Sequence, residues 1–565
     1  MPRLHSPHWL ALSLLTLATL AAVAADSDAP ASSIRPADLE DRTRILASDR
    51  FEGRAPGSRG EELTVQHLAE SFQSLGLQPG GRNGSWFQEV PLVGIRSLVL
   101  ATTSRNGARE SWAFPQDFVA WSPRMQPQIH VEASELVFVG YGVVAPEYQW
   151  NDFKDADLRG KTLVMLVNDP PIPDPKDPSK LDPTFFRGNA MTYYGRWTYK
   201  FEIAAAKGAA AALVIHETGP AGYPYFVVIN SWGRENFDLA SPRGNADKLA
   251  VAGWLSLDRA RQLCAAAGHD LATLKQRALQ PDFRPIPLGI QIDLNVTNTL
   301  REVRSRNVAA LLPGQHPERK KEFVVYSAHW DGLGIDDRLP GDKIFNGALD
   351  NATGVAVLLE IAEAYARLPS APDRSVLFLA LTAEEQGLLG ARYYAEFPLH
   401  PLARTLANIN MDGANVAGRR ADVGVIGYGQ STLEDLLLQA ALTQGRSVRP
   451  EAEPEKGGFF RSDHFEFSKV GVPSLYLDSA SDEILGQPPG YGKKRREEYR
   501  ENDYHKVTDE MKPWWNFEGA AEDARLLFEV GRQVANRSTW PAWKPGSEFK
   551  ARREAILREA TAATP

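Results

Sequence analysis

The apolar residues of the region 291–540 fall into two kinds of segment that alternate along the chain. Residues 323–328 and 375–381 are continuous apolar runs rich in β-branched and aromatic side chains, which is typical of strands buried on both faces. Between them, residues 354–368 have the pattern of a buried helix. Strands that alternate with helices predict an α/β fold with a largely parallel sheet covered on both faces. Two further strands are expected at residues 406–411 and 474–477.

The residues before this region show other patterns. A helix is expected at residues 61–72, where apolar side chains recur at helical spacing and Gly76 follows as a stop signal. Between 87 and 121, short alternating runs broken by turns indicate strands. Residues 120–290 contain strand-like runs such as 135–144 and an Ala-rich helix, but no cluster of metal-ligating residue types. We therefore expect this segment to bind or cover a site and not to catalyse.

The N-terminus has the pattern of an export signal. Arg3 precedes a charge-free, mainly apolar run over residues 10–25, which ends in small residues before Asp26. Its sixteen residues fall short of the roughly 20 that a membrane-spanning helix needs, so a cleaved signal peptide is favoured over an anchor or a buried helix. The expected location is periplasmic or secreted. Cys264 is the single cysteine and forms no internal disulfide, which is compatible with that location.

Composition and charge exclude several classes of protein. A chain of 565 residues with 43% hydrophobic and 24% charged residues is too long and too apolar for a disordered segment, and it predicts several domains. The formal net charge of −8 provides no basic surface for gripping a phosphate backbone. We therefore expect no nucleic-acid partner, and no membrane span once the signal is removed.

Acidic residues and histidines gather where the predicted sheet opens. His329 and Asp331 follow one strand, Glu384 and Glu385 follow another, and Asp350 stands in a loop before a helix. Ligands of α/β sheets bind beyond the carboxyl ends of the strands. Imidazole and carboxylate groups suit a pair of divalent metals such as zinc. Two further residues of these types lie at Asp412, after a third strand, and at His505, in a late loop.

A pair of metals imposes requirements that these residues can meet. Two cations a few ångströms apart need a carboxylate between them, and a free carboxylate beside them can take a proton from the water that bridges them. Adjacent Glu384 and Glu385 can divide such roles, because neighbours that leave a strand point in different directions. The spacing His-x-Asp lets Asp331 hold the second ring nitrogen of His329 and fix its tautomer.

The segments around these residues resemble a known family. They are FVVYSAHWDGLG at 323–334, NGALDNATGVAVLLEI at 346–361, ALTAEEQGLLGA at 380–391, NINMDG at 408–413, RSDHFEF at 461–467 and DYHKVTD at 503–509. Their order and spacing resemble the co-catalytic zinc peptidases that include secreted leucyl aminopeptidases, glutamate carboxypeptidase and the transferrin receptor. The resemblance covers nearly all of 36–90 and 291–540.

The resemblance implies a fold, two zinc ions and a role for each residue. The fold would be a mixed, mostly parallel sheet flanked by helices, with an inserted β-rich protease-associated domain. One zinc would be bound by His329 and Asp412, the other by Glu385 and His505, with Asp350 bridging both, Glu384 as the general base and Asp331 behind His329. The expected divisions are a signal peptide at 1–25, the first part of the peptidase domain at 26–119, the protease-associated insertion at 120–290, the catalytic domain at 291–540 and a charged tail at 541–565.

The chain departs from the family pattern at two places. Leu349 stands where many members have a second Asp, a change outside the ligand set. Phe459 and Phe460 occupy a stretch where members often have a Tyr that assists the oxyanion. This leaves the oxyanion donor open, with candidates in three loop tyrosines, Tyr428, Tyr491 and Tyr504.

The expected function is that of an exported di-zinc aminopeptidase, which hydrolyses the N-terminal peptide bond of peptides with a bridging water and a Glu general base. Carboxypeptidases or dipeptidases of the same family are an alternative, because the residues that would hold a substrate ammonium or carboxylate are not identified by sequence. A receptor-like member without activity is another, although such a protein should have lost ligands. A single-zinc cyclase of N-terminal glutamine is a third. The sequence leaves side-chain preference and oligomeric state open.

Overall fold

The central sheet of the computed structural model, which describes residues 30–478 and 481–562, is built from the predicted apolar runs. Strand β13 (Phe323–His329) pairs in parallel with β16 (Ser375–Leu381) on one side and with β17 (Thr405–Asn410) on the other. Strand β20 (Ser474–Asp478) continues the parallel order beyond β17. Antiparallel partners complete the sheet, so the prediction of a mixed, mostly parallel sheet flanked by helices is confirmed. Strand β12 (Ile286–Leu312) pairs antiparallel with β16, and β18 (Asp422–Val425) pairs antiparallel with β20. At the edge, β19 (Ser447–Pro450) pairs in parallel with β18.

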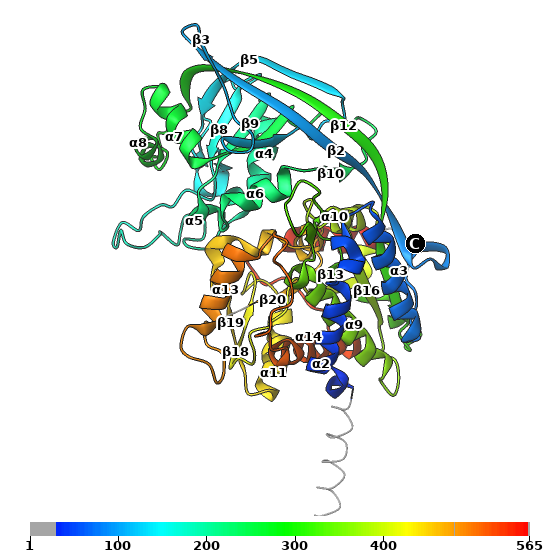
Figure 1. The fold of residues 1–565 in the computed structure, drawn as a ribbon. Coiled ribbons are helices and arrows are strands. Elements are labelled where there is room, and N and C mark those ends of the chain that lie inside the picture. The colour runs from blue at the N-terminus through cyan, green and yellow to red at the C-terminus, as the bar shows by residue number, and fades with distance from the viewer. Residues whose placement is uncertain (1–29, 479–480, 563–565) are drawn as a thin grey trace, which may run out of the picture.

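Both faces of this sheet are covered by helices, which explains why its strands are apolar throughout (Figure 1). Alternate side chains of one strand enter different cores: Tyr326 packs in the larger core and Val325 in the smaller one. The larger core is closed by α2 (Pro36–Leu46), α3 (Arg59–Ser74), α9 (Thr353–Ala366), α11 (Leu433–Thr443) and α14 (Glu518–Asn536). The smaller core is closed by α10 (Leu389–Glu396) and α12 (His464–Lys469).

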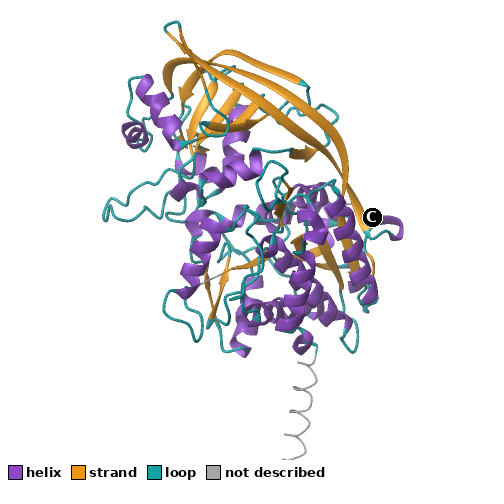
Figure 2. Cartoon of the chain, viewed as in Figure 1, coloured by secondary structure: helices purple, strands orange, loops and turns teal. Residues whose placement is uncertain are grey.

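Two long antiparallel strands join this part of the molecule to a second, β-rich part (Figures 1 and 2). Strand β2 (Phe87–Arg105) and β12 stay in register from the pair Phe87 and Val308 to the pair Ser104 and Gln291. The last residues of β12 pair with β16, while its earlier residues pair with β5 (Gln128–Phe138). One strand therefore belongs to both sheets and fixes their relative position.

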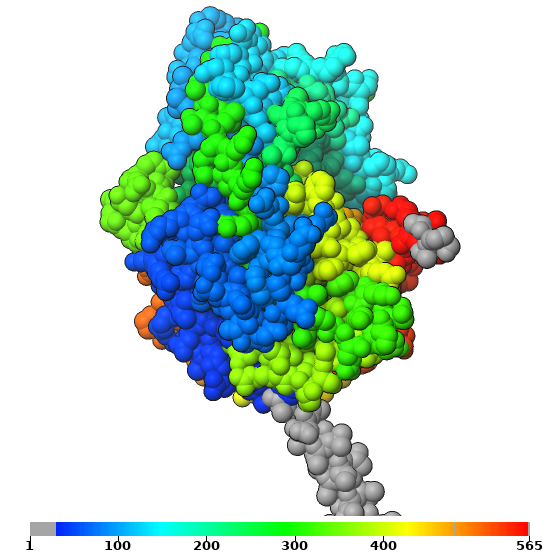
Figure 3. Space-filling model, turned by 90° about the vertical axis from the view of Figure 1, so that its right-hand side faces the viewer, coloured from blue at the N-terminus to red at the C-terminus, as the bar shows by residue number. Residues whose placement is uncertain are grey.

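The second part has its own sheet and core. Beyond β5 the strands β8 (Thr162–Leu166), β9 (Ala211–Ile215) and β11 (Val251–Leu255) run parallel, and β4 (Phe118–Trp121) closes the edge. Its main apolar core draws on residues between Val99 and Val296, apart from the core of the central sheet. In the space-filling view this part, cyan to green, stands above the remainder (Figure 3). Its helices are α4 (Trp197–Ala206), α5 (Thr218–Ala221), α6 (Tyr225–Trp232), α7 (Leu257–Ala266) and α8 (Leu271–Arg277).

The remaining elements are short strands and two late helices. The strands are β1 (Gln78–Pro79), β3 (Ala108–Ser111), β6 (Val144–Ala145), β7 (Trp150–Asn151), β10 (Asn236–Leu239), β14 (Gly334–Ile335) and β15 (Ile344–Phe345). The helices are α13 (Tyr491–Asn502) and α15 (Lys550–Ala562). The charged C-terminal segment contributes Trp543 and Phe549 to a buried aromatic cluster with Phe459 and Phe460.

Most predicted elements lie within two or three residues of the observed ones, and one differs. The helix predicted at 61–72 is α3, and that at 354–368 is α9. The strand expected at 135–144 ends at Phe138, because Gly140 and Gly142 adopt φ of +62° and +64° and turn the chain. The predicted signal peptide, residues 1–25, lies outside the described residues. Across 30–478 and 481–562, the helices are too short or too polar to cross a bilayer.

Candidate metal centre

Six of the seven residues singled out in the sequence converge at the carboxyl edge of the central sheet, and the seventh supports them. His329 is the last residue of β13, and Asp412 lies two residues after β17. Glu384 and Glu385 follow β16, and Asp350 stands in the turn that leads into α9. The sixth, His505, comes from the loop after α13, and the seventh is Asp331. Parallel strands bring their carboxyl ends to one edge, which is why residues far apart in sequence meet here.

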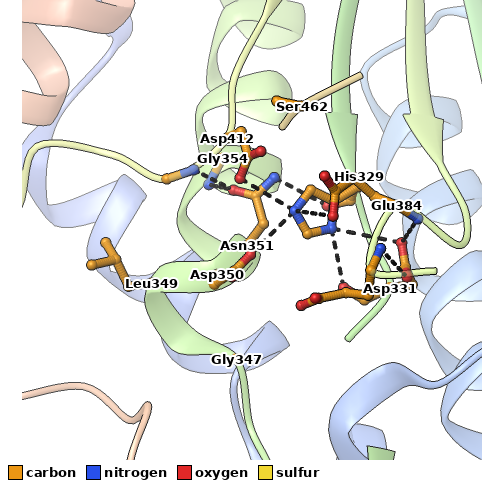
Figure 4. Close-up of polar contacts among 12 residues, drawn as sticks. His329, Asp331, Gly347, Leu349, Asp350, Asn351, Gly354, Glu384, Asp412 and Ser462 are labelled. Carbon is orange, nitrogen blue, oxygen red and sulfur yellow. Dashed lines mark hydrogen bonds and ion pairs between the residues drawn. The ribbon is translucent and has the colours of Figure 1, made fainter. Parts of the chain in front are cut away.

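The ligand atoms form two groups that share one carboxylate. His329, Asp350 and Asp412 offer atoms within 4.8 Å of one another, and so do Asp350, Glu385 and His505. The Nε2 atom of His329 lies 3.2 Å from Oδ1 of Asp350 and 3.3 Å from Oδ1 of Asp412 (Figure 4). The Nε2 atom of His505 lies 3.4 Å from Oδ2 of Asp350 and 3.1 Å from Oε2 of Glu385. The two oxygens of Asp350 thus face different groups.

Both imidazoles are oriented through their other nitrogen. Nδ1 of His329 lies 3.6 Å from Oδ1 of Asp331 and 3.3 Å from its backbone oxygen. Nδ1 of His505 is 2.8 Å from Oγ of Ser231, and Nδ2 of Asn230 donates to the His505 backbone oxygen at 2.8 Å. Each ring therefore presents Nε2 to the carboxylates, which is the orientation that a metal ligand needs.

Asp331 has a second role that its spacing did not reveal. Its Oδ1 accepts a hydrogen bond from the backbone N–H of Glu384 at 3.0 Å, and its Oδ2 accepts one from that of Glu385 at 3.4 Å. The side chain is fully buried, and Figure 4 shows it between the His329 ring and the Glu384 backbone. One carboxylate therefore fixes both the ring that ends β13 and the loop that follows β16.

Two residues that sequence analysis missed hold the turn around Asp350. Oδ1 of Asn351 accepts the backbone N–H groups of Gly354 at 3.0 Å and Gly413 at 2.8 Å, and its amide donates to the backbone oxygen of Met411 at 3.1 Å. Asp509 accepts the N–H groups of Leu349 at 3.0 Å and Asp350 at 3.1 Å. Leu349 itself packs against the larger core and is not among the clustered donors.

The charges of the cluster favour bound cations. Burial favours the neutral imidazole of His329, yet the carboxylates of Glu384 and Asp412 outweigh it and raise the pKa of His329. Burial also opposes charge on His505, but Glu385 and Asp350 raise its pKa to about 10. Four carboxylates thus face two imidazoles, and this excess of negative charge is what a pair of divalent metals would neutralise. The donor set, imidazole nitrogen with carboxylate oxygen, fits zinc.

The two glutamates stand in different environments. Burial raises the pKa of Glu384, and the charges of Asp412 and Asp463 add to the effect. Its Oε2 lies 3.9 Å from Nε2 of His329, outside both groups of clustered donors. Burial also raises the pKa of Glu385, while His505 opposes the shift. Glu385 therefore lies within one group of clustered donor atoms, and Glu384 lies beside the two groups.

Two cavities open on either side of this centre. One, of about 510 Å³, is lined by Asp350, Glu384 and Asp412. The other, of about 710 Å³, is lined by Glu384, Glu385 and His505, together with side chains from α4 and α6. Glu384 borders both cavities.

The three candidate tyrosines for the oxyanion are placed differently. Tyr428 is 48% exposed, and the ring of Tyr491 is covered by the guanidinium of Arg495 at 4.8 Å. Tyr504 borders both cavities, and its ring centre lies 4.0 Å from that of His505. Another tyrosine near the metals, Tyr476, donates its hydroxyl to the backbone oxygen of Asp412 at 2.9 Å. Of the three candidates, Tyr504 is the one beside the cluster.

The structure is thus an α/β fold with a mixed, mostly parallel sheet, and at the carboxyl edge of this sheet two groups of His and carboxylate side chains share Asp350. Residues 307–526, less than half of the chain, match the model of Peptidase family M28. The matched segment contains all seven residues discussed above.

Named relatives match part of the chain. Aminopeptidase NAALADL1 of Mus musculus is 34% identical over 165 residues, 26% of this chain and 20% of that protein. Aminopeptidase YwaD of Bacillus subtilis is 26% identical over 206 residues, 36% of each chain. Among solved structures, an aminopeptidase from Aneurinibacillus sp. strain AM-1 has a TM-score of 0.49 and 18% identity, covering 92% of this chain and 97% of its own. The chain thus spans a fifth to about a third of the length of these two sequence relatives.

The double contact of Asp331 predicts the effect of Asp331→Asn. This change removes the negative charge behind His329. It also replaces one of the two carboxylate oxygens, which accept the backbone N–H groups of Glu384 and Glu385, by an NH₂ donor. Zinc affinity should fall by roughly 10–100-fold while the fold is kept. Competition with a chelator of known affinity measures the loss, and circular dichroism checks the fold. Asp337→Asn, at a side chain that is 90% exposed, is the matched control and should titrate as the wild type does. Identical chelator curves for all three proteins would contradict this role.

Proposed function

We propose that this protein is an exported zinc-dependent aminopeptidase, which hydrolyses the N-terminal peptide bond of peptides. The observation that carries the proposal is the pair of ligand groups that share Asp350. The match of residues 307–526 to the model of Peptidase family M28 supports a peptidase, and the named relatives are aminopeptidases. Export rests on the apolar run at residues 10–25, and the assignment of 120–290 as a protease-associated insertion rests on the resemblance.

The proposed ligand set follows the two groups. One zinc ion would be held by His329 and Asp412, the other by Glu385 and His505, and Asp350 would contribute one oxygen to each. When bound, two zinc ions supply Lewis-acid chemistry, which polarises a carbonyl and makes a water molecule more acidic. Asp331 and Ser231 keep the two imidazoles in the orientation that this ligand set requires.

Glu384 is the proposed general base and acid. Its carboxylate borders both cavities, so it can accept a proton from the attacking water on one side and deliver it to the leaving amine on the other. Burial raises its pKa, which makes the protonated form accessible during turnover. The hydrogen bond from its backbone N–H to Asp331 limits movement of the residue. The Tyr504 hydroxyl, which borders both cavities, is the proposed donor to the oxyanion.

The segment 120–290 forms part of the wall of the larger cavity. Trp197 and Phe201 of α4 and Ser231 of α6 contribute to its wall, and Asn230 holds the backbone of His505. Because both parts of the chain contribute walls to the cavity, access to it is restricted. Restricted access favours the end of a peptide as substrate over an internal loop of a folded protein. The covering role of the segment stays a prediction.

The choice between an aminopeptidase and a carboxypeptidase is tested with blocked peptides. A neutral pentapeptide should be shortened from its N-terminus, because the proposed substrate presents a free ammonium there. Acetylation of that N-terminus should abolish cleavage, whereas amidation of the C-terminus, several residues from the scissile bond, should leave it. Mass spectrometry of the products identifies which end is released. Cleavage of the acetylated peptide together with loss of activity on the amide would convert the assignment to a carboxypeptidase.

The roles of the two glutamates predict opposite outcomes for matched variants. Glu384→Gln should keep two zinc ions per chain and lose roughly 10²–10⁴ in kcat, because it removes proton transfer and no ligand. Glu385→Gln should lose one zinc. Elemental analysis of dialysed protein and turnover of the pentapeptide give the two readouts. Loss of zinc in the Glu384 variant with retention in the Glu385 variant would exchange their roles.

Removal of the Tyr504 hydroxyl should affect the chemical step. Loss of one oxyanion donor typically costs about 10²–10³ in rate, so Tyr504→Phe should lower kcat by that order with zinc content unchanged. The exposed Tyr428, changed to Phe, is the control and should keep the wild-type rate. Equal rates for the three proteins would mean that zinc alone stabilises the oxyanion.

A further inference from the structure

Two arginines from distant parts of the chain line the larger cavity. Arg196 directly precedes α4, in the β-rich part of the molecule. Arg461 lies in the loop before α12, on the central sheet's side. Both border the 710 Å³ cavity that also contains Glu385 and His505. The cavity that leads to the metal centre is therefore lined by a cation from each of the two parts.

Neither guanidinium has an acidic partner. Arg196 is 8% exposed, and its buried Nε has no hydrogen-bond partner. Within residues 30–478 and 481–562, no hydrogen bond or ion pair joins its guanidinium to another residue. The Cζ atom of Arg196 lies over the ring of Trp197, 5.4 Å from its centre. Arg461 donates Nη2 to the backbone oxygen of Ala221 at 2.6 Å and lies over the ring of Tyr223 at 5.0 Å, but its buried Nε also lacks a partner.

The other long cations around this cavity are neutralised. Arg392 pairs with Glu396 at 3.1 Å, Lys469 pairs with Glu466 at 2.6 Å, and Lys248 pairs with Asp238. Burial lowers the pKa of Arg196 to about 10, and the like charge of Arg461 adds to the shift. A buried guanidinium without a counter-ion is costly, a second cation in the same wall adds to the cost, and an anion that enters the cavity would remove it. The pair therefore has the properties of a preformed anion site.

The position of the two arginines relative to the candidate metal centre indicates which anion they would bind. Tyr504 borders the same cavity as the two arginines, and its ring centre lies 4.0 Å from that of the neighbouring His505, so the cavity wall that contains the arginines reaches the edge of the candidate metal centre. We infer that Arg196 and Arg461 together bind a carboxylate of the peptide substrate, carried by a residue next to the scissile bond. This rests on the proposed peptidase function and deepens it. A guanidinium fork matches the two oxygens of a carboxylate, and such charge-assisted bonds are among the stronger ones in proteins.

Two substrate groups share this chemistry. The first is the C-terminal carboxylate of a dipeptide, which would make the protein a preferential dipeptidase. The second is an acidic side chain at the first or second residue. Matched pairs of compounds separate the two sources. The first source is tested by comparing Leu-Ala with its C-terminal amide. The second is tested by comparing Glu-Ala-amide with Gln-Ala-amide and Leu-Glu-amide with Leu-Gln-amide.

The experiment measures kcat/KM of the zinc-loaded full chain on each pair. The inference predicts that the acid is preferred over its neutral partner at least about tenfold in one pair, through KM and not kcat. Arg196→Ala and Arg461→Ala should each bring that ratio to within about twofold of one. Arg196→Lys keeps the charge without the fork and should give an intermediate ratio. Arg392→Ala, a cation of the same cavity that is already paired, should keep the wild-type ratio.

A binding readout keeps this test separate from the proposed function. Titration calorimetry of the same compounds into the Glu384→Gln protein measures affinity without turnover. Ratios near one in all pairs of an active enzyme would overturn the carboxylate site and leave the peptidase proposal standing. A protein that hydrolyses none of the compounds but binds one acid at least tenfold more tightly through Arg196 would keep the site and contradict the peptidase. Equal or undetectable binding throughout would overturn the site.

Discussion

The shared carboxylate of Asp350 is the group on which the candidate centre depends. Two divalent cations a few ångströms apart repel each other, and an anion between them is what allows both to bind. Its Oδ1 faces His329 and its Oδ2 faces His505, so a small rotation of this side chain would disturb both groups together. The turn that carries it is held by hydrogen bonds to the side chains of Asn351 and Asp509.

The centre also depends on the β-rich part of the molecule. Ser231 orients the ring of His505, and Asn230 holds its backbone, although both lie more than 270 residues earlier in the chain. The long strand β12 connects the two parts of the molecule, because it pairs with β16 at one end and with β5 at the other. A segment without metal ligands of its own thus contributes to the geometry of the site and to the wall of the larger cavity.

The amino-acid sequence predicted the positions of the candidate metal ligands better than it predicted the residues that hold those ligands in place. His329 and Glu384 follow continuous apolar strands, so hydrophobic patterning alone was enough to place them at one edge of the sheet. Asn351 and Asp509 act through backbone N–H groups of a turn, and no periodicity indicates such contacts. The unpaired Arg196 was equally hidden, since a missing partner becomes visible only when all neighbouring side chains are placed.

The most direct test of the account is the number and position of bound metals. Crystals of the zinc-loaded protein, measured at the zinc absorption edge, should give two anomalous peaks, one between His329 and Asp412 and one between Glu385 and His505, with Asp350 between the peaks. A single peak, or two peaks of which neither contacts Asp350, would contradict the shared carboxylate and with it the two-metal centre.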